Sequence, residues 1–416
     1  MKYVIEGGNR LKGEVRINGA KNSVLPILAA TLLNKGVSIL HSCPKLKDVY
    51  SMIEILRHLG CTVEFNDSDI IVDSSGVIDY HIPDKLMRAM RSSIFLMGAL
   101  VARNNIAQIS FPGGCDIGHR PIDLHLKSLR KLGISIYESY GYINCKCSSI
   151  GGGEIHLDLP SVGATENIML AASMADGTTV IGNAAKEPEI EDLQNFLNSM
   201  GAKISGAGTN TIVIRGVKEL HDTEYTIIPD RIVAGTYLIA SAITKGEVVL
   251  TNVVKRHIDS LLSKLNECGF KIVSGNDFIK LEPCARAKAV DMIITLPFPG
   301  FPTDLQAQMV SLLSTADGTS IITETIFDNR FKYTEELVRM GADIKVDGRI
   351  AVVKGVEKLT GTNVLAKDLR GGAALVLAGL GAVGTTIVED IEHIDRGYED
   401  FSENLKNLGA SIERTM

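Results

Sequence analysis

The stretch Met52–Phe65, MIEILRHLGCTVEF, decides the fold because its pattern recurs along the chain. Apolar residues at helical spacing lead to Gly60, and a strand-like alternation follows it. A glycine directly after a helix commonly takes the left-handed conformation that ends the helix. The stretch therefore predicts an amphipathic helix that stops at a glycine and turns into a strand.

Five more segments repeat this phrase, spaced roughly 70 residues apart. They are 124–138, 193–206, 261–274, 334–347 and 401–414, with Gly133, Gly201, Gly269, Gly341 and Gly409 at the turn. A second phrase, made of a small-residue apolar helix, a turn and a β-branched strand, interleaves with the first at 25–40, 92–110, 167–182, 234–250, 306–323 and 372–388. Helices that are apolar all round must be buried, so we expect them inside and the sheets outside.

Six copies of a β-α-β-α-β-β unit predict an α/β protein with two inside-out barrel domains of three repeats each. The last copy lacks a strand, and the N-terminal residues 3–7 resemble the missing one. We therefore expect a discontinuous domain, 1–20 plus 229–416, closed by the N-terminal strand. Residues 21–228 form the inserted domain. The chain then crosses twice, which makes a hinge, and ligands favour clefts between domains.

Composition excludes several classes of protein. The 416 residues carry a net charge of −6, which argues against a nucleic-acid binder driven by overall positive charge. No apolar run is long enough to span a bilayer, and we expect no signal peptide. Seven scattered cysteines without a C-x-x-C pair fit a reducing cytoplasm. Cys145 and Cys147 are only a weak metal candidate, so we expect neither a metal nor a cofactor.

The segment 110–124, SFPGGCDIGHRPIDL, reads as an exposed loop around Cys115. Prolines bracket it, and its glycines allow close approach to a ligand. His119 and Arg120 follow the thiol, and nearby cations stabilise a thiolate. A reactive cysteine is one interpretation, and a surface turn with an incidental cysteine is the other.

A second candidate, Lys21 with Asn22, precedes a buried helix. We expect Asn22 or Ser23 to cap that helix and Pro26 to lie in its first turn. A lysine beside a helix N-terminus binds anions well, although a capped helix with a solvated lysine remains the alternative.

Asp304, in the run FPGFPTDLQ at 298–306, is either a helix cap or a general base. Arg396 is either an anion clamp or half of a surface pair with Asp395 or Glu399. The same position, just before a buried helix, recurs in every repeat. It is occupied by Lys21–Asn22, Arg91, Val162–Thr165, Arg231, Asp304 and Asp368–Arg370. Converging positive helix ends predict a site for a strongly anionic ligand.

Together these motifs resemble the UDP-N-acetylglucosamine 1-carboxyvinyltransferase family over the whole chain. The resemblance rests on 19–22 (GAKN), 112–115 (PGGC) with 120–124 (RPIDL), 161–167 (SVGATEN), 301–306 (FPTDLQ) and 393–398 (HIDRGY). It implies the two-domain inside-out fold. It also implies transfer of the enolpyruvyl group of phosphoenolpyruvate to the 3′-hydroxyl of UDP-N-acetylglucosamine, the first committed step of peptidoglycan synthesis. Phosphate leaves from a tetrahedral intermediate.

The resemblance also implies residue roles. Cys115 would protonate C3 and form a covalent adduct, and Asp304 would take the 3′-hydroxyl proton. Lys21, Arg120 and Arg396 would hold phosphoenolpyruvate, and Asn22 would contact the intermediate. The remaining substrate-binding candidates are Arg91, Pro121, Ile122, Asp123, Leu124, Ser161, Val162, Gly163, Ile326, Asp368 and Arg370. No nucleic acid, membrane insertion or obligate protein partner is implied, and the antibiotic fosfomycin should alkylate Cys115.

Departures from the family pattern are few. Asp116 and His119 stand where relatives carry smaller or uncharged residues, and they would shift the Cys115 pKa in opposite directions. Gly371–Gly372 replaces the commoner Ala-Gly. Two rivals remain: 5-enolpyruvylshikimate-3-phosphate synthase, whose motif carries Ser-Lys-Ser and whose loop lacks the cysteine, and an inactive paralogue that senses UDP-sugar.

Overall fold

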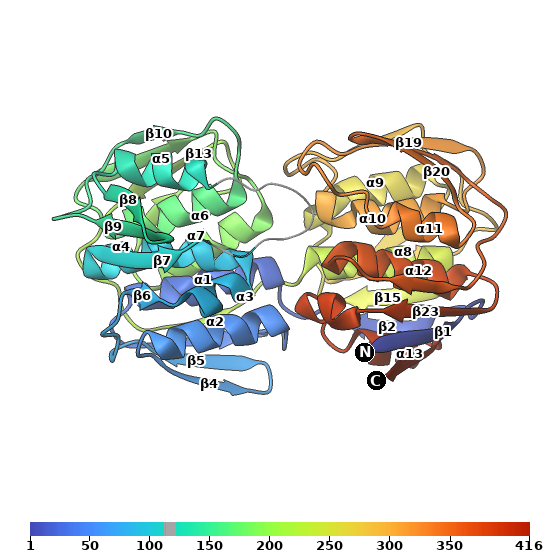
Figure 1. Ribbon diagram of the computed structural model, residues 1–416, viewed down its shortest axis with the longest axis horizontal. Coiled ribbons are helices and arrows are strands. Elements are labelled where there is room, and N and C mark those ends of the chain that lie inside the picture. Colours follow the sequence, from blue (N-terminus) through green and yellow to red (C-terminus); the bar gives the residue numbers. More distant parts are fainter. Residues whose placement is uncertain (112, 114–121) are drawn as a thin grey trace. The chain divides into compact units, whose positions relative to one another are not determined.

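The protein is described here by a computed structural model that covers residues 1–111, 113 and 122–416, with the backbone alone at residues 89 and 91. It divides into two compact units (Figure 1). The terminal unit comprises 1–18 and 229–416, and the inserted unit comprises 19–113 and 122–228 of the described residues. Each unit has its own hydrophobic core.

Three four-stranded sheets build the described part of the inserted unit, in the orders β14-β3-β5-β4, β6-β7-β9-β8 and β10-β11-β13-β12. Its strands are β3 (Val37–His41), β4 (Thr62–Asn66), β5 (Asp69–Asp73), β6 (His81–Ile82), β7 (Ile106–Ser110), β8 (Ser135–Ser139), β9 (Tyr142–Lys146), β10 (Glu154–His156), β11 (Thr178–Gly182), β12 (Lys203–Ser205), β13 (Thr211–Arg215) and β14 (Thr223–Thr226). Its helices are α1 (Lys21–Ala30), η1 (Thr31–Leu33), α2 (Lys47–His58), α3 (Asp84–Ala89), η2 (Arg91–Phe95), α4 (Leu96–Asn104), α5 (Asp123–Lys131), α6 (Val162–Ala172) and α7 (Pro188–Ser199).

The terminal unit has the same plan, with sheets β16-β17-β15-β2, β18-β19-β21-β20 and β22-β23-β1-β24. Its strands are β1 (Lys2–Glu6), β2 (Lys12–Arg16), β15 (Glu247–Thr251), β16 (Lys271–Ser274), β17 (Phe278–Glu282), β18 (Met292–Ile294), β19 (Thr319–Thr323), β20 (Asp343–Asp347), β21 (Ile350–Lys354), β22 (Asn363–Leu365), β23 (Thr385–Glu389) and β24 (Ser411–Thr415). Its helices are α8 (Arg231–Ile243), η3 (Lys255–His257), α9 (Asp259–Glu267), η4 (Thr303–Leu305), α10 (Gln306–Leu313), α11 (Thr334–Arg339), α12 (Leu369–Gly381), η5 (Ile391–Arg396) and α13 (Phe401–Asn407).

The repeat prediction is confirmed at its turns. The six glycines that end the amphipathic helices all have a positive φ, between 84° and 106°. In each sheet one edge strand runs parallel to its neighbour, and the other pairs are antiparallel. Strand β1 pairs with both β23 and β24, so the N-terminal segment occupies the place for which the last repeat has no strand.

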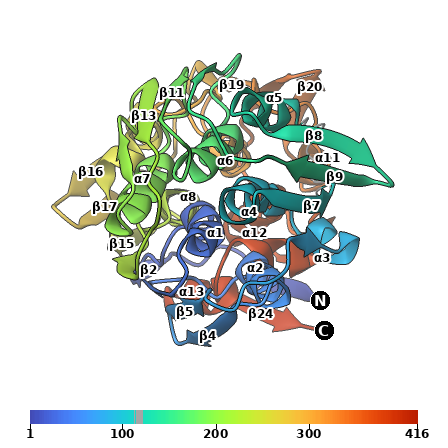
Figure 2. The same cartoon turned by 90° about the vertical axis from the view of Figure 1, so that its left-hand side faces the viewer.

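The small-residue helices lie inside, as predicted, because they have no polar face to offer water. Every residue of α12 from Arg370 to Leu380 is buried, whereas α2 buries Met52 and Ile55 and exposes Glu54. Figure 2 shows α1, α4 and α6 in the middle of the inserted unit, with β4–β5, β8–β9 and β11–β13 around them. Glycine permits this packing: a Cβ at Gly98 on α4 would collide with Asn167 on α6. Small residues thus let the buried helices approach one another closely.

Two helix-start predictions were wrong in detail. Helix α1 already begins at Lys21, with Ala20 as its cap residue and no side-chain cap, so Asn22 and Ser23 lie in its first turn and Pro26 lies in its interior. The helix expected directly after Arg91 opens with the 3-10 turn η2, and α4 begins only at Leu96. Among the described residues, no helix has both the length and the apolar character needed to cross a bilayer.

Candidate active site

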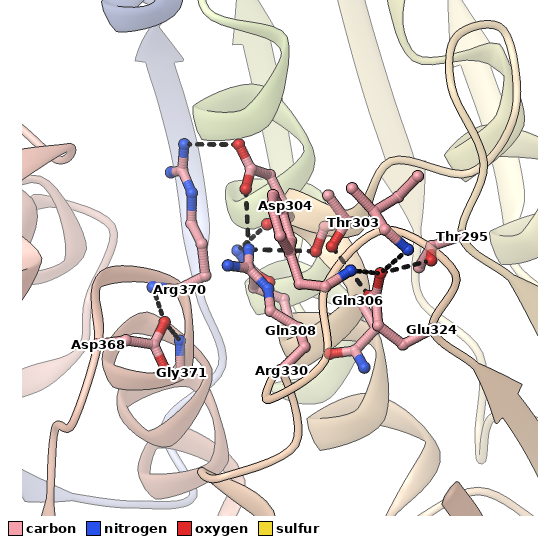
Figure 3. Close-up of polar contacts among 12 residues, drawn as sticks. Thr295, Thr303, Asp304, Gln306, Gln308, Glu324, Arg330, Asp368, Arg370 and Gly371 are labelled. Carbon is pink, nitrogen blue, oxygen red and sulfur yellow. Dashed lines mark hydrogen bonds and ion pairs between the residues drawn. The ribbon is translucent and has the colours of Figure 1, made fainter. Parts of the chain in front are cut away.

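Asp304 is the centre of the polar cluster drawn in Figure 3. It lies in η4, a 3-10 turn that begins after Pro302 and leads into the buried helix α10. Its Oδ1 receives a bond of 2.8 Å from Arg330 Nη2, and its Oδ2 lies 3.3 Å from Arg370 Nη2. The helix-cap interpretation of Asp304 is therefore not what the structure shows: both carboxylate oxygens bind guanidinium groups.

Arg370 reaches Asp304 from the start of α12. The Asp368 carboxylate caps this helix by accepting from the backbone N–H groups of Arg370, at 2.9 Å, and Gly371, at 3.0 Å. The guanidinium also lies over the Tyr398 ring, 5.4 Å from its centroid. Burial opposes charge on Arg370, but the carboxylates of Asp304 and Asp230 and the Tyr398 hydroxyl raise its pKa overall. Arg370 therefore remains a cation although it is buried.

A glutamine beneath the turn holds its backbone in place. Gln308 Nε2 donates to the Asp304 carbonyl oxygen and to the Tyr398 hydroxyl, each at 3.0 Å. Asp230 caps α8 in the same way as Asp368 caps α12, by accepting from two backbone N–H groups. The charge of the Asp230 carboxylate raises the pKa of Arg370, and Arg370 also pairs with Asp304. The N-termini of α8, α10 and α12 therefore meet at one end of the terminal unit.

Unused donors remain in this cluster. Arg370 Nη1, Arg330 Nε and Gln306 Nε2 are buried and have no hydrogen-bond partner among the described residues. Buried donors normally find partners, and ligands are one way to supply them. The cluster therefore combines two guanidiniums and an amide with a carboxylate whose position is fixed.

The other predicted residues of the terminal unit are Arg396 and Ile326. Arg396 ends η5, and the two acidic residues considered as its alternative partners also contact other residues. Asp395 pairs with Arg414 at 2.6 Å, and Glu399 accepts from Asn18 at 2.6 Å. Ile326 lies after β19 with 38% of its surface exposed, and its N–H donates to Glu324.

In the inserted unit, Lys21 is the first residue of α1 and is buried. Its Nζ lies 2.6 Å from Oδ2 of Asp48, a buried residue in the first turn of α2. The interpretation as a solvated surface lysine is therefore wrong. Nearby, Ser23 donates to Asp192, whose pKa burial raises to about 6.

Ser161, Val162 and Gly163 start α6. The Ser161 hydroxyl caps the helix by accepting from Ala164 N–H at 3.3 Å. A Cβ at Gly163 would lie 3.1 Å from the His125 ring, so glycine lets the helix start approach that ring. Ile122, Asp123 and Leu124 lie at the start of α5, the helix that carries His125.

Three predicted site residues, Cys115, Arg120 and Pro121, lie outside the described residues, as do Asp116 and His119. The Arg91 side chain does too, although its backbone opens η2. The six described cysteines are all free thiols. Burial raises the pKa of Cys43, Cys61, Cys145 and Cys268 to about 12, and it raises the pKa of Cys147 and Cys284 as well.

The fold and this cluster define a class of protein, and comparison with known proteins agrees. The profile of EPSP synthase (3-phosphoshikimate 1-carboxyvinyltransferase) matches residues 5–405, so the chain belongs to that family. The solved structure of the enolpyruvyl transferase NikO from Streptomyces tendae has a TM-score of 0.89 and 26% identity, covering 99% of this chain and 98% of that one. EPSP synthase from Acinetobacter baumannii shares the fold, with a TM-score of 0.79 at 17% identity over the full length of both chains.

Closer relatives place the chain within that family. It is 72% identical, over 100% of both chains, to UDP-N-acetylglucosamine 1-carboxyvinyltransferase 2 of Caldanaerobacter subterraneus subsp. tengcongensis. It is 52% identical, over 99% of both, to UDP-N-acetylglucosamine 1-carboxyvinyltransferase 1 of the same bacterium. The chain is therefore a member of the UDP-N-acetylglucosamine 1-carboxyvinyltransferases, and the resemblance noted from its motifs is confirmed.

Sequence reasoning missed several residues that contact the predicted site residues. Arg330 and Glu324 lie in the segment after β19, which carries no glycine or proline motif and does not precede a buried helix. Asp48 lies in the first turn of the amphipathic helix α2, where a carboxylate usually only interacts favourably with the helix dipole. The run Thr323–Arg330 held one weak signal, a glutamate followed six residues later by an arginine, but that spacing predicts no chemistry by itself.

Proposed function

We propose that the protein transfers the enolpyruvyl group of phosphoenolpyruvate to the 3′-hydroxyl of UDP-N-acetylglucosamine and releases phosphate. The observation that carries the proposal is the Asp304 carboxylate held by Arg330 and Arg370, in a chain 72% identical to a named UDP-N-acetylglucosamine 1-carboxyvinyltransferase. The two guanidiniums fix the position of this carboxylate, and a general base must be positioned within reach of the proton it takes.

The reaction is an addition followed by an elimination. Asp304 takes the proton of the 3′-hydroxyl while the hydroxyl oxygen bonds to C2 of phosphoenolpyruvate, and Cys115 gives a proton to C3. The tetrahedral intermediate then loses phosphate from C2 and a proton from C3, which restores the double bond. Each proton transfer by a positioned side chain contributes about 10²–10⁴-fold to such a rate.

Cations bind the anionic groups of the substrates. Lys21, Arg120 and Arg396 would hold the phosphate and carboxylate of phosphoenolpyruvate and stabilise the charge that develops on them. Lys21 suits this role because it opens α1, where the helix dipole and free N–H groups also favour an anion. Asn22, the next residue, would contact the intermediate.

The UDP-sugar would contact residues at helix starts. We assign Arg91, Arg120–Leu124 and Ser161–Gly163 in the inserted unit, and Ile326, Asp368 and Arg370 in the terminal unit. The close approach that Gly163 permits at the start of α6 supports this assignment. No metal is required by the scheme. The free thiols fit a reducing cytoplasm, where we place the reaction.

Phosphate release with alternative acceptors tests the proposal. The purified protein, phosphoenolpyruvate and UDP-N-acetylglucosamine should release one phosphate for each enolpyruvyl sugar formed. Shikimate 3-phosphate, the acceptor of the rival synthase, should support no release above background. Turnover with shikimate 3-phosphate alone would overturn the assignment, and the absence of turnover with either acceptor would favour the inactive paralogue.

A further inference from the structure

Glu324 lies directly after β19 and is buried, with 1% of its surface exposed. Its carboxylate receives four hydrogen bonds. Oε1 accepts from the Thr295 hydroxyl at 2.9 Å, from Ile326 N–H at 2.8 Å and from Phe327 N–H at 3.1 Å. Oε2 accepts from the Thr303 hydroxyl at 2.9 Å. Figure 3 shows these contacts around the labelled Glu324 side chain.

These bonds join three separate segments of the terminal unit. Thr295 directly follows β18, at the start of the loop that leads to η4, and Thr303 is the first residue of η4. Ile326 and Phe327 belong to the loop after β19, which continues to Arg330. Glu324 therefore holds the turn that carries Asp304 and the loop that carries Ile326 and Arg330.

The same segments meet a second time at Asp304. Arg330 Nη2 binds the Thr303 carbonyl oxygen at 3.3 Å and Asp304 Oδ1 at 2.8 Å. The connections thus form a closed ring: Glu324 to Thr303, along the chain to Asp304, across to Arg330, and back along the chain to Glu324. The Glu324–Thr303 and Arg330–Asp304 contacts together fix the Asp304 carboxylate more firmly than either contact alone.

We propose that Glu324 is a positioning residue of this active site, which sets Asp304 and the Ile326 loop in their working positions without touching substrate. The proposal rests on the function proposed above, because that function makes Asp304 the general base and Ile326 a contact of the UDP-sugar. A carboxylate is needed because four donors converge, and two carboxylate oxygens offer about four lone-pair sites whereas an amide oxygen offers two. A displacement of about 1 Å at a reacting group can cost about 10²-fold in rate.

Variants of Thr303 distinguish a positioning role of Glu324 from a contribution to stability alone. In Thr303→Val the side chain keeps its shape but loses the hydroxyl that reaches Glu324. We expect kcat to fall by about 10- to 10²-fold, with KM for UDP-N-acetylglucosamine nearly unchanged, because the Ile326 contacts remain. Thr303→Ser restores the hydroxyl and should restore kcat. A residue that acted only on stability would lower the folded fraction and leave kcat per folded enzyme unaltered.

Glu324→Gln acts on both segments. Its amide oxygen would face the three donors at the Oε1 position, and its amide group would face the Thr303 hydroxyl, which can turn to accept. We expect a smaller fall in kcat than in Thr303→Val but a rise in KM for UDP-N-acetylglucosamine, because the Ile326 loop is held less well. Glu357→Gln, at an exposed glutamate of the same unit, is the matched control and should behave as wild type.

The test is the phosphate-release assay on the full chain, with kcat divided by the fraction of molecules that bind UDP-N-acetylglucosamine. Wild-type kcat in both Thr303→Val and Glu324→Gln would overturn the proposal, and so would a Thr303→Ser variant as slow as Thr303→Val. Asp304→Asn is run beside them. If Asp304→Asn turns over normally, the function assigned to Asp304 fails and the positioning role fails with it. If Asp304→Asn is inactive while Thr303→Val and Glu324→Gln both keep the wild-type kcat, only the role of Glu324 fails.

Discussion

Replacing Arg330 with methionine should slow the reaction by releasing Asp304. The Arg330 side chain is 3% exposed, and methionine keeps most of its length without its charge. The change removes the 2.8 Å bond to Asp304 Oδ1 and the 3.3 Å bond to the Thr303 carbonyl. Arg370 still binds Oδ2, so the carboxylate keeps one of its two anchors.

The size of the effect follows from these contacts. A hydrogen bond to a charged group contributes about 1.5–3 kcal/mol. The Asp304 side chain is 27% exposed, so water replaces part of the loss and the lower end of that range applies to stability. If the same free energy is lost from the positioned transition state, kcat falls by roughly 10- to 10²-fold, since about 1.4 kcal/mol corresponds to a factor of ten.

A double-mutant cycle with Asp304→Asn checks the reasoning. The assay is phosphate release at saturating concentrations of both substrates. We expect Arg330→Met to be slow, Asp304→Asn to be slower, and the double variant to be no slower than Asp304→Asn, because Arg330 acts through that carboxylate. Arg339→Met, at a guanidinium whose side chain is 58% exposed, is the control. Effects of Arg330→Met and Asp304→Asn that multiply would refute the account.

Three further predictions concern the inserted unit and the thiols. Fosfomycin should add to Cys115 alone, because burial raises the pKa of every described cysteine. The Cys115→Asp variant should stay active and resist the drug. Mass spectrometry that maps adducts to other cysteines would contradict this prediction. The folded pKa of Asp192 is raised from 3.8 to about 6, so its contribution to stability is complete below pH 3.8 and is lost as pH rises through 6, a change of about 3 kcal/mol. Urea unfolding at several pH values should show this decline in the wild type and not in Asp192→Asn, and parallel pH profiles would count against it. Asp48→Asn should lower Tm because Lys21 loses its 2.6 Å partner, and phosphoenolpyruvate should raise Tm more in this variant than in the wild type; equal shifts would argue that Lys21 does not meet the ligand.

The architecture was readable from the chain because it is periodic. Glycines such as Gly60 and Gly201 end amphipathic helices at a regular interval, and their positive φ values follow from the absence of a Cβ. Helices such as α12 could be placed inside because they have no polar face. Exact helix starts were harder, since whether Asn22 caps α1 depends on where the preceding backbone turns, a matter of tertiary context.

The candidate site was readable only where it follows the repeat. Lys21, Asp304 and Arg370 stand at the starts of buried helices, which the sequence marks. Arg330 and Glu324 were not found because their role depends on contacts with a turn more than 20 residues away in the chain. The sequence of residues 324–330 does not by itself indicate that the Arg330 side chain contacts Asp304 or that Glu324 contacts Thr303.

The central claim is that Asp304, held between two guanidiniums, takes the proton of the 3′-hydroxyl. The most direct measurement is kcat of Asp304→Asn together with its Kd for UDP-N-acetylglucosamine by calorimetry. The account predicts a fall in kcat of about 10²–10⁴-fold with little change in Kd, because a base acts in the transition state. A variant that binds the sugar nucleotide normally and turns over at the wild-type rate would contradict it.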